Sequence, residues 1–356
     1  MMLCLLGGFL GSGKTTAIVT AAKIFVRDNI SLAVITNDQG SQLVDAAFID
    51  SLNIPGTDVR NGCFCCNYDQ FYSAIENLHR SLASQVIFAE AVGSCADLVA
   101  TIVKPLNRFH PEIDVSLSVF ADGPVLLSSI EGRSSFVSND IQYIYKKQLE
   151  EAALIVINKC DLLTGDDMKK IESMFASEYP GKRLLFQDSR EEASVRKWMD
   201  IIQHKTNGKE LTALTLDYDK YGAGEAALGW LDASVIIHSK QRAIAKAYEF
   251  INEMLDEISF QNLSIGHLKF FLESGAWQKK ISYTSADNSR LDSHSTAIAD
   301  HVRVLVNVRV ESDPKRLKKI FYHAIQKKQD QNCHAEIIEV DSFQPGYPKP
   351  THRMND

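Results

Sequence analysis

The segment Gly8–Thr15 carries the clearest chemical signal in the chain, because it matches the pattern G-x-x-x-x-G-K-[ST] between an apolar run and a stretch of helical periodicity. Glycines let backbone N–H groups curl around phosphates, and the helix that follows points its positive end at the same anion. Lys14 would neutralise the β- and γ-phosphates, and the Thr15 hydroxyl would coordinate Mg²⁺. We expect the nucleotide to be bound here by Gly8, Gly11, Ser12, Gly13, Lys14, Thr15 and Thr16.

The base of that nucleotide is indicated by Asn158-Lys159-Cys160-Asp161, which directly follows the apolar run Ala153–Ile157. The Asp161 carboxylate can accept two hydrogen bonds from guanine, from N1–H and the 2-amino group, and adenine offers no such pair. Asn158 would contact the purine edge, and the Lys159 stem would lie along the ring and ribose. Solvated turns also produce this tetrapeptide, but together with the phosphate loop it favours GTP over ATP.

Two further segments read as nucleotide-sensing switches. Glu90 ends an apolar run and is followed by Gly93, so the acid could hold Mg²⁺ and the glycine N–H could approach the γ-phosphate. Asn37–Gly40 follows an earlier strand, and Asp38 could reach Mg²⁺ or the attacking water. We expect Lys14, Asp38 and Glu90 to be the catalytic residues. The plainer alternatives are a capped turn after Glu90 and an Asx turn at Asn37–Gly40.

Three thiols lie within four positions at Cys63, Cys65 and Cys66. Three soft ligands so close together suit Zn²⁺, Co²⁺ or another thiophilic divalent metal, with a fourth site left for water, a carboxylate or a partner's ligand. Spacing tighter than Cys-x-x-Cys fits a transfer site better than a closed structural one. Reactive surface thiols or buried small hydrophobes are the alternatives.

Cys95 lies two residues after Gly93 and could supply a fourth sulfur if the Glu90–Gly93 switch swings toward the cysteine cluster. The alternative for a single cysteine is a small buried apolar residue. The seven cysteines are an odd number, and apart from the cluster they are scattered, which indicates reduced thiols rather than a disulfide framework.

Composition limits the classes of protein that remain. The chain has 356 residues and 45% hydrophobic content, enough for about two domains with well-buried cores. A net charge of −7 disfavours nucleic acid as a partner. Apolar runs fall short of the roughly 20 residues that span a bilayer, so we expect no membrane partner and a soluble, cytoplasmic protein.

Short apolar runs alternate with amphipathic stretches through about residue 206, which predicts a doubly wound α/β domain with a parallel sheet. The expected strands are Leu3–Gly7, Leu32–Thr36, Val86–Ala89, Val115–Ala121, Leu154–Asn158 and Arg183–Phe186. The expected helices are Thr15–Arg27, Tyr68–Ser81, Leu98–Phe109 and Asp140–Glu151. Such sheets bind ligands at the carboxyl ends of their strands.

The rest of the chain predicts a smaller α+β domain, with a ferredoxin-like order of elements. We expect the P-loop domain over residues 1–206, a polar linker over 207–230, the α+β domain over 231–343 and a flexible, proline-containing tail over 344–356. The strands of the second domain are expected at Ala233–His238, Ile265–Leu272, Lys280–Thr284, Val302–Val310 and Ala335–Val340, and its helices at Ile244–Ile258 and Pro314–Lys327.

In this order, the motifs resemble those of the CobW-type metal-trafficking P-loop GTPases, relatives of UreG and HypB. The resemblance rests on Gly8–Thr15, Asn37–Gly40, Gly62–Cys66, Glu90–Gly93 and Asn158–Asp161, and covers about the first 200 residues. It implies a GTP-hydrolysing metallochaperone in which the cysteine loop binds the metal and nucleotide state changes its affinity. By the same analogy, a nucleotide-dependent homodimer could complete the site.

The leading hypothesis is a GTPase that binds GTP, GDP and Mg²⁺ and delivers a divalent metal from the cysteine loop to a client metalloprotein or a corrinoid or tetrapyrrole pathway protein. The alternative is a GTP-dependent conformational chaperone for a corrinoid or cobalamin-linked enzyme, with structural cysteines. The sequence of the second domain names neither the client nor the metal.

Overall fold

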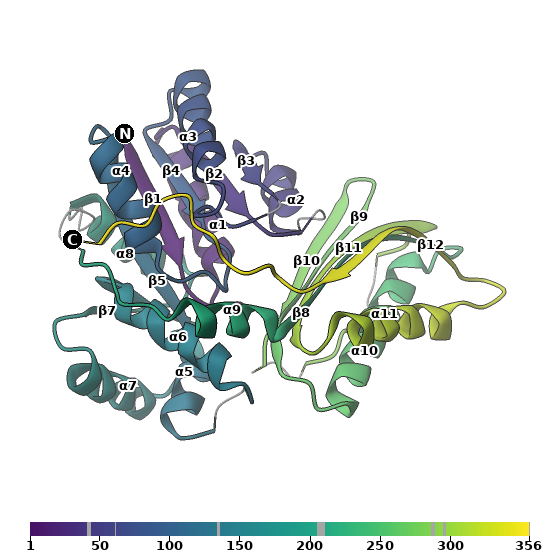
Figure 1. Ribbon diagram of the computed structural model, residues 1–356. Helices are drawn as coiled ribbons and strands as arrows, with labels where there is room; N and C mark the ends of the chain where they lie inside the picture. Colours follow the sequence, from purple (N-terminus) through teal and green to yellow (C-terminus); the bar gives the residue numbers. More distant parts are fainter. Residues whose placement is uncertain are drawn as a thin grey trace. The chain divides into compact units, whose positions relative to one another are not determined.

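The computed structural model describes residues 1–40, 44–60, 62–133, 136–204, 211–285, 289–294 and 297–355. The chain forms two compact units, traced by colour in Figure 1. Unit 1 comprises Met1–Gln39, Leu52–Gly224 and Tyr347–Asp356, and unit 2 comprises Gly40–Ser51 and Glu225–Gly346. Each unit therefore contains a segment that the order of the sequence would assign to the other.

Unit 1 is built on a seven-stranded parallel sheet of order β3-β2-β4-β1-β5-β6-β7. Its strands are β1 (Met2–Gly7), β2 (Leu32–Asn37), β3 (Gly56–Val59), β4 (Val86–Glu90), β5 (Asp114–Asp122), β6 (Leu154–Asn158) and β7 (Arg183–Gln187). The predicted doubly wound fold is confirmed. The sequence analysis missed the edge strand β3, because its residues are largely polar and exposed and form no apolar run.

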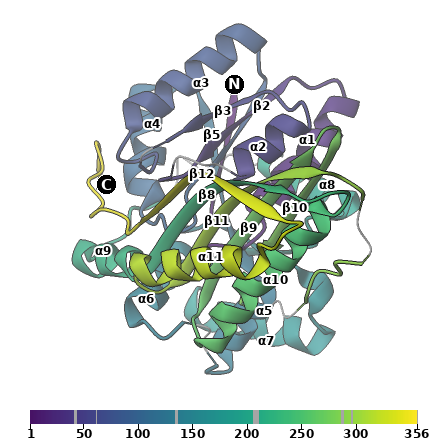
Figure 2. The same cartoon turned by 90° about the vertical axis from the view of Figure 1, so that its right-hand side faces the viewer.

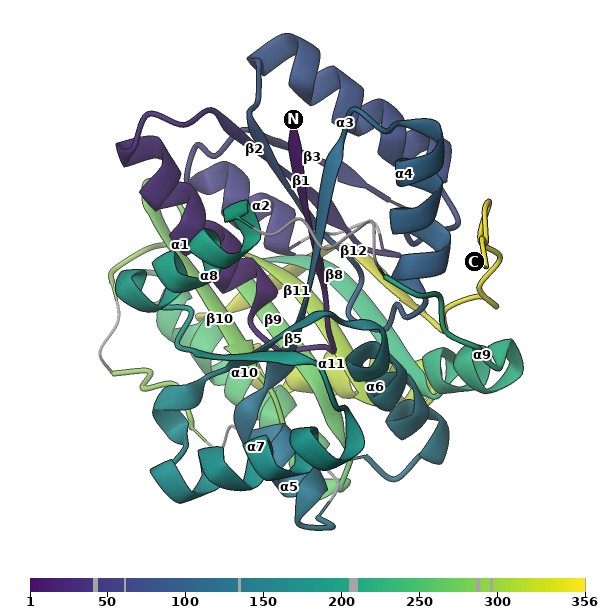
Figure 3. The ribbon, with the colours of Figure 1, turned by 90° about the vertical axis from the view of Figure 1, so that its left-hand side faces the viewer.

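Helices flank this sheet, and α1 and α8 lie side by side on one of its faces (Figure 3). Phe25 of α1 and Trp198 of α8 both pack against Phe88 of β4. The helices of unit 1 are α1 (Lys14–Arg27), α3 (Tyr68–Leu82), α4 (Lys104–Phe109), α5 (Gly123–Ile130), α6 (Asn139–Glu151), α7 (Gly165–Glu178) and α8 (Glu192–His204). Within the described ranges of the whole chain, no helix combines the length and apolar character needed to cross a membrane.

The helix expected over Leu98–Phe109 is divided in the structure. Val99–Val103 forms a π-helical turn, and α4 follows it directly. Pro105 stands in the first turn of α4, where it has no N–H to donate to the preceding turn. The hydrogen-bonding pattern therefore changes from π-helical to α-helical at the turn where Pro105 lacks the N–H that a continuous α-helix would need.

Unit 2 contains a five-stranded antiparallel sheet of order β10-β9-β11-β8-β12. Its strands are β8 (Leu228–His238), β9 (Ile265–Ser274), β10 (Trp277–Tyr283), β11 (His301–Glu311) and β12 (His334–Phe343), and its long helices are α10 (Ala243–Phe260) and α11 (Pro314–Lys328). Without the added edge strand β10, the order β9-β11-β8-β12 is that of a β-α-β-β-α-β ferredoxin-like fold. The expected α+β class of this domain is confirmed.

The two faces of the unit 2 sheet are covered by different helices (Figure 2). Alternate side chains such as Phe270 and Val306 point into the main core with α10 and α11. Phe271 and Leu305 point to the opposite face, where they contact Val44 of helix α2 (Val44–Ser51). Helix α2, which the sequence analysis did not predict, therefore belongs to the core of unit 2 although it follows β2 of unit 1 in the chain.

Buried polar groups help to hold α2 on this sheet. The Arg309 guanidinium pairs with the Asp232 carboxylate at 2.6 Å, and both side chains are completely buried. Asn307 donates to Asp232 at 2.7 Å and accepts the Val44 N–H at 2.8 Å. A Cβ at Gly40 would lie 1.5 Å from an Asp232 carboxylate oxygen, so only glycine fits there. The end of the predicted switch segment Asn37–Gly40 is thus packed on the second sheet.

Two predicted boundaries differ from the structure. Helix α9 (Tyr218–Ala226) and the start of β8 fall inside the expected linker over 207–230, and the boundary at residue 206 lies outside the described residues. The C-terminal segment, expected as a flexible tail over 344–356, runs past α4 in Figure 1 and is bonded to unit 1 from Tyr347 onward. Prolines prevent regular structure there, but the Thr351 and Met354 N–H groups donate to the carbonyls of Cys65 and Ala100.

Asp45 on α2 is the basis of a stability prediction. Burial opposes its ionisation, but the ammonium groups of Lys269 and Lys280, at 2.5 and 2.6 Å, hold its pKa well below the usual range. Asp45→Asn should lower the free energy of unfolding by about 2–4 kcal/mol at pH 7, because two largely buried ammonium groups lose their counter-charge. A lowered pKa stabilises the fold above the unfolded value near 3.8, so the difference should shrink as pH falls below it.

Urea denaturation of the full chain at pH 7 and pH 3, compared between the wild type and Asp45→Asn, measures this effect. Asp50→Asn is the matched control, because Asp50 lies on the same helix with an exposed side chain. Equal destabilisation by the two substitutions at pH 7 would contradict the role given to Asp45.

Candidate functional site

The loop between β1 and α1 has the shape of a phosphate cradle. Gly8, Gly11 and Gly13 have φ angles of 119°, 74° and 88°, a region that residues with a Cβ rarely adopt. A Cβ at Gly8 would lie 2.1 Å from the Phe120 carbonyl oxygen, and one at Gly13 would lie 2.1 Å from the Asn158 amide nitrogen. The glycines are therefore required both by conformation and by close packing against β5 and β6.

Side chains around this loop offer a cation and oxygen ligands. The buried Lys14 ammonium donates to the carbonyl oxygens of Gly8 at 2.6 Å and Phe9 at 3.3 Å, which curls it back over the loop. The Thr15 hydroxyl donates to a Glu90 carboxylate oxygen at 3.0 Å, and both groups are buried. A hydroxyl and a carboxylate in contact beside a phosphate cradle fit Mg²⁺, which prefers oxygen ligands.

The remaining predicted phosphate-side residues differ in their positions. The Ser12 hydroxyl is buried with no hydrogen-bond partner among the described residues, which fits a group that would bond a phosphate oxygen. Thr16 is exposed on α1. A Cβ at Gly93 would lie 2.9 Å from the Leu10 nitrogen, so this switch glycine touches the phosphate loop. Asp38 follows β2, and its N–H bonds to the Val59 carbonyl at 3.4 Å.

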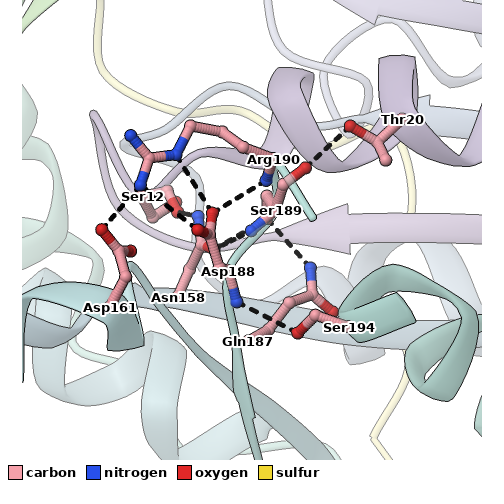
Figure 4. Close-up of polar contacts among 9 residues, drawn as sticks. All are labelled: Ser12, Thr20, Asn158, Asp161, Gln187, Asp188, Ser189, Arg190 and Ser194. Carbon is pink, nitrogen blue, oxygen red and sulfur yellow. Dashed lines mark hydrogen bonds and ion pairs between the residues drawn. The ribbon is translucent and has the colours of Figure 1, made fainter. Parts of the chain in front are cut away.

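The base side of the site is drawn in Figure 4. The Asn158 amide donates to the Ser12 carbonyl at 2.8 Å and accepts the Ser189 N–H at 3.0 Å and its hydroxyl at 2.7 Å. Asn158 is buried, and these bonds connect the phosphate loop to the loop after β7. Its expected contact with the purine edge stays a prediction. Lys159 has a left-handed φ of 58°, and its ammonium pairs with Asp122 at 2.6 Å.

Asp161 lies partly exposed near the hydrogen bonds of Asn158. A carboxylate that accepts hydrogen bonds from the base is expected at this position. Arg190 donates to it at 2.6 Å and also bonds Asp188 (Figure 4). Guanine would have to compete with the Arg190 guanidinium for the Asp161 carboxylate.

Sequence reasoning did not identify Asp122, Ser189 or Arg190 as parts of the nucleotide site. Asp122 is the last residue of β5, and Ser189 and Arg190 follow β7. Their position in the sequence could have identified them, because polar residues at or after the carboxyl ends of parallel strands meet at one edge of the sheet. No spacing motif marked them, because their partners are far away in the chain.

The three clustered thiols converge in a tight turn. The Cys63 sulfur lies 2.8 Å from that of Cys65 and 3.1 Å from that of Cys66, and the Cys65 and Cys66 sulfurs are 3.9 Å apart. Among the residues that the structure describes, this is the cluster of ligand atoms suited to a metal ion. Cys63 and Cys65 are buried, and Cys66 is partly exposed.

Contacts between the thiols shift their pKa values. The hydrogen bonds with Cys65 and Cys66 lower the pKa of the Cys63 thiol, and the bond with Cys63 raises the pKa of the Cys66 thiol to about 11. Helix α3 begins at Tyr68, just after the cluster, so its positive end also favours thiolate here. Three thiols so arranged suit a thiophilic metal ion.

One asparagine joins this loop to the first switch segment. The Asn37 amide donates to the carbonyl oxygens of Val59 at 3.0 Å and Gly62 at 2.8 Å, and it accepts the Phe64 N–H at 3.0 Å. Asn37 is buried and is the last residue of β2. A displacement of Asn37–Gly40 would therefore be transmitted to the cysteine loop.

The C-terminal strap, residues 347–355, crosses the same loop. The Thr351 N–H donates to the Cys65 carbonyl at 2.8 Å, and the Lys349 N–H donates to the Cys66 sulfur at 3.4 Å. Arg353 anchors the strap on the buried Asp97 carboxylate at 2.8 Å. The sequence analysis did not connect this segment with the cysteine loop.

The phosphate cradle lies at the carboxyl edge of a parallel sheet and is connected through loops to the three clustered thiols. These features define a P-loop nucleotide-binding protein with a candidate metal site. The family model described as "CobW/HypB/UreG, nucleotide-binding domain" matches residues 2–185. The chain belongs to this family.

Curated relatives match about half of the chain. The zinc-regulated GTPase metalloprotein activator 1 of Dictyostelium discoideum is 26% identical over 51% of this chain and 44% of its own length. The zinc chaperone CobW of Pseudomonas aeruginosa is 22% identical over 52% of this chain and 56% of its own length. The chain thus spans about half the length of these relatives.

A solved structure of HypB from Helicobacter pylori, in complex with nickel, superimposes with a TM-score of 0.43 at 14% identity. The superposition covers 60% of this chain and 91% of that one.

Asp161→Asn tests the base site. The amide presents a donor to the guanine N1–H, so affinity for GDP should fall by about 100-fold or more, while xanthosine diphosphate should become the better ligand. Isothermal titration with both nucleotides measures the change. Asp166→Asn, at a fully exposed position on α7, is the control and should leave GDP binding unchanged. Undiminished GDP affinity in the Asp161 variant would exclude Asp161 as the base acceptor.

Arg353→Ala tests the strap. Removing the guanidinium leaves the Asp97 carboxylate, 1% exposed, with fewer partners, so the free energy of unfolding should fall by about 1–3 kcal/mol. Cys66 should also react faster with a thiol-alkylating reagent in metal-free protein, because the strap over it is loosened. Lys349→Ala keeps the strap's backbone bonds and should match the wild type in both measurements. An unchanged Cys66 reaction rate in Arg353→Ala would show that Arg353 does not hold the strap in place.

Proposed function

We propose that this chain is a GTP-dependent zinc metallochaperone, which carries Zn²⁺ at Cys63, Cys65 and Cys66 and hands it to a client protein. The observation that carries the proposal is the Asn37 side chain, two of whose hydrogen bonds join the first switch segment to the cysteine loop at Gly62 and Phe64. Through these hydrogen bonds, a movement of the switch on nucleotide exchange would change the metal affinity of the cysteine loop.

The nucleotide half of the function rests on the phosphate loop. Lys14 would leave its carbonyl acceptors for the β- and γ-phosphates, and the loop N–H groups would bind the same oxygens. Thr15 and Glu90 would hold Mg²⁺, which supplies charge neutralisation to the phosphates when bound. Glu90 and Asp38 are the proposed groups for orienting the attacking water, and Gly93 would offer its N–H to the γ-phosphate.

The cargo half rests on the thiols. Three sulfurs within 4 Å of one another suit a thiophilic divalent ion, and Zn²⁺ binds thiolates at about 2.3 Å. The names of the two relatives, a zinc-regulated activator and a zinc chaperone, support zinc over other such ions. Co²⁺ would bind the same donor set and serves as a spectroscopic substitute.

Hydrolysis would change the metal site through the two switches. Loss of the γ-phosphate removes a ligand from the Gly93 segment and from the Asn37–Gly40 segment, and Asn37 would carry the second displacement to Gly62 and Phe64. The metal affinities of the GTP and GDP states must differ for transfer to occur, because a metal bound equally by both shifts no population.

Unit 2 is the proposed client-selecting part. Residue Gly40 at the end of the first switch segment and helix α2 belong to unit 2, where they contact Asp232 and Asn307. Nucleotide state would thereby reach the second sheet through the chain itself. A client metalloprotein or corrinoid or tetrapyrrole pathway protein, and a nucleotide-dependent homodimer, stay predictions from the sequence.

Zn²⁺ affinity of the full chain, measured with GDP and with a nonhydrolysable GTP analogue, tests the proposal. We expect the two constants to differ by about tenfold or more, equivalent to a coupling free energy of about 1.4 kcal/mol. Asn37→Ala should narrow this difference, because it cuts the hydrogen bonds between switch and loop. Asn77→Ala, at an exposed position on α3, should leave the difference as in the wild type.

Two outcomes would overturn the proposal. Equal Zn²⁺ constants in the two nucleotide states would exclude coupling. Metal content unchanged in a Cys63→Ser/Cys65→Ser/Cys66→Ser variant, purified without chelator, would exclude the cysteine loop as the cargo site and favour the conformational-chaperone alternative.

A further inference from the structure

A fourth thiol lies at the cysteine cluster. Cys95, in the loop that follows β4, is 1% exposed, and its thiol hydrogen-bonds to that of Cys63. The Cys63 sulfur therefore has three thiol partners, two from its own loop and one from the second switch segment. The sulfurs that lie within 4.8 Å of one another are those of Cys63, Cys65 and Cys66, so Cys95 is joined to this group through Cys63. The sequence separates Cys95 from the cluster by nearly thirty positions, and the parallel sheet brings them together because β2, β3 and β4 are neighbours.

The backbone around Cys95 is held from several sides. Its N–H bonds to the Val92 carbonyl at 2.9 Å, and the buried Gln148 amide of α6 donates to the carbonyls of Gly93 at 3.0 Å and of Cys95 at 2.8 Å. The next residue, Ala96, donates its N–H to the Tyr221 hydroxyl at 3.2 Å. These bonds hold the backbone of Cys95 in place, two residues after Gly93.

We infer that Cys95 is the fourth ligand of the metal, which completes a tetrahedral four-sulfur site with Cys63, Cys65 and Cys66. This inference rests on the proposed function and deepens it. Zn²⁺ in a site of four protein ligands is tetrahedral, and a short loop with three thiols leaves one corner open. Each thiol binds as thiolate and releases its proton to solvent.

Because the fourth ligand comes from the second switch segment, movement of that segment would control whether the metal site is closed or open. Three sulfurs come from the loop held by Asn37, and the fourth comes from the segment that carries Gly93 and touches Leu10 of the phosphate loop. With Cys95 bound, the metal has no exchangeable position. Withdrawal of Cys95 opens one corner of the tetrahedron to a client's ligand.

X-ray absorption spectroscopy of the full chain loaded with one equivalent of Zn²⁺ tests the assignment. The wild type should show four Zn–S distances near 2.3 Å. Cys95→Ala and Cys95→Ser should show three Zn–S distances and one lighter ligand at about 2.0–2.2 Å, with Zn²⁺ affinity reduced on the order of 100-fold. GDP affinity like that of the wild type shows that each variant is folded.

Cys333→Ser is the matched control, since Cys333 is a buried cysteine of unit 2. It should keep four sulfurs and the wild-type affinity. Three Zn–S distances in the wild type, or four in both Cys95 variants, would overturn the role of Cys95 and leave the proposed function standing. Zinc bound without sulfur from the Cys63–Cys66 loop would overturn both.

Discussion

The hydrogen bonds of Asn37 are the interaction on which the arrangement of the candidate metal site depends. Its amide occupies the end of β2 and bonds the backbone of the cysteine loop on both sides of Cys63. Asn158 makes the corresponding hydrogen bonds at the end of β6, where its side chain connects the phosphate loop to the loop that follows β7. An amide has both a donor and an acceptor, so one buried side chain can bind two loops at once without an unpaired charge.

These ties matter because the elements they connect have no regular structure between them. Parallel strands deliver their loops to one edge of the sheet, but loops without hydrogen bonds to each other would move independently. Gly8, Gly13 and Gly93 allow the backbones to approach closely, and the buried amides then hold them. Phosphate binding, switch position and sulfur geometry become properties of one connected network within unit 1.

The chain passes between its two units more often than two consecutive domains would require. Gly40–Ser51 leaves unit 1 and packs in unit 2 through Val44 and Asp45, and the C-terminal strap returns from unit 2 to the cysteine loop. Both exchanged segments are directly connected to the candidate site: the first continues from Asn37–Gln39, and the second covers Cys66. The covalent chain thereby connects the candidate nucleotide site and the candidate metal site of unit 1 with segments of unit 2.

The sequence by itself determined the local chemistry. Gly8–Thr15 requires a phosphate loop because glycine spacing, lysine and the helix start are consecutive, and the three clustered thiols are neighbours by covalent geometry. The strand and helix periods likewise predicted most of both sheets. Only the tertiary structure decided that Asn158 bonds two loops, that the Cys95 thiol bonds that of Cys63 and that the strap is bonded to Cys66. Those contacts join residues far apart in the chain, and their partners are chosen by strand order and burial, which no local pattern of residues encodes.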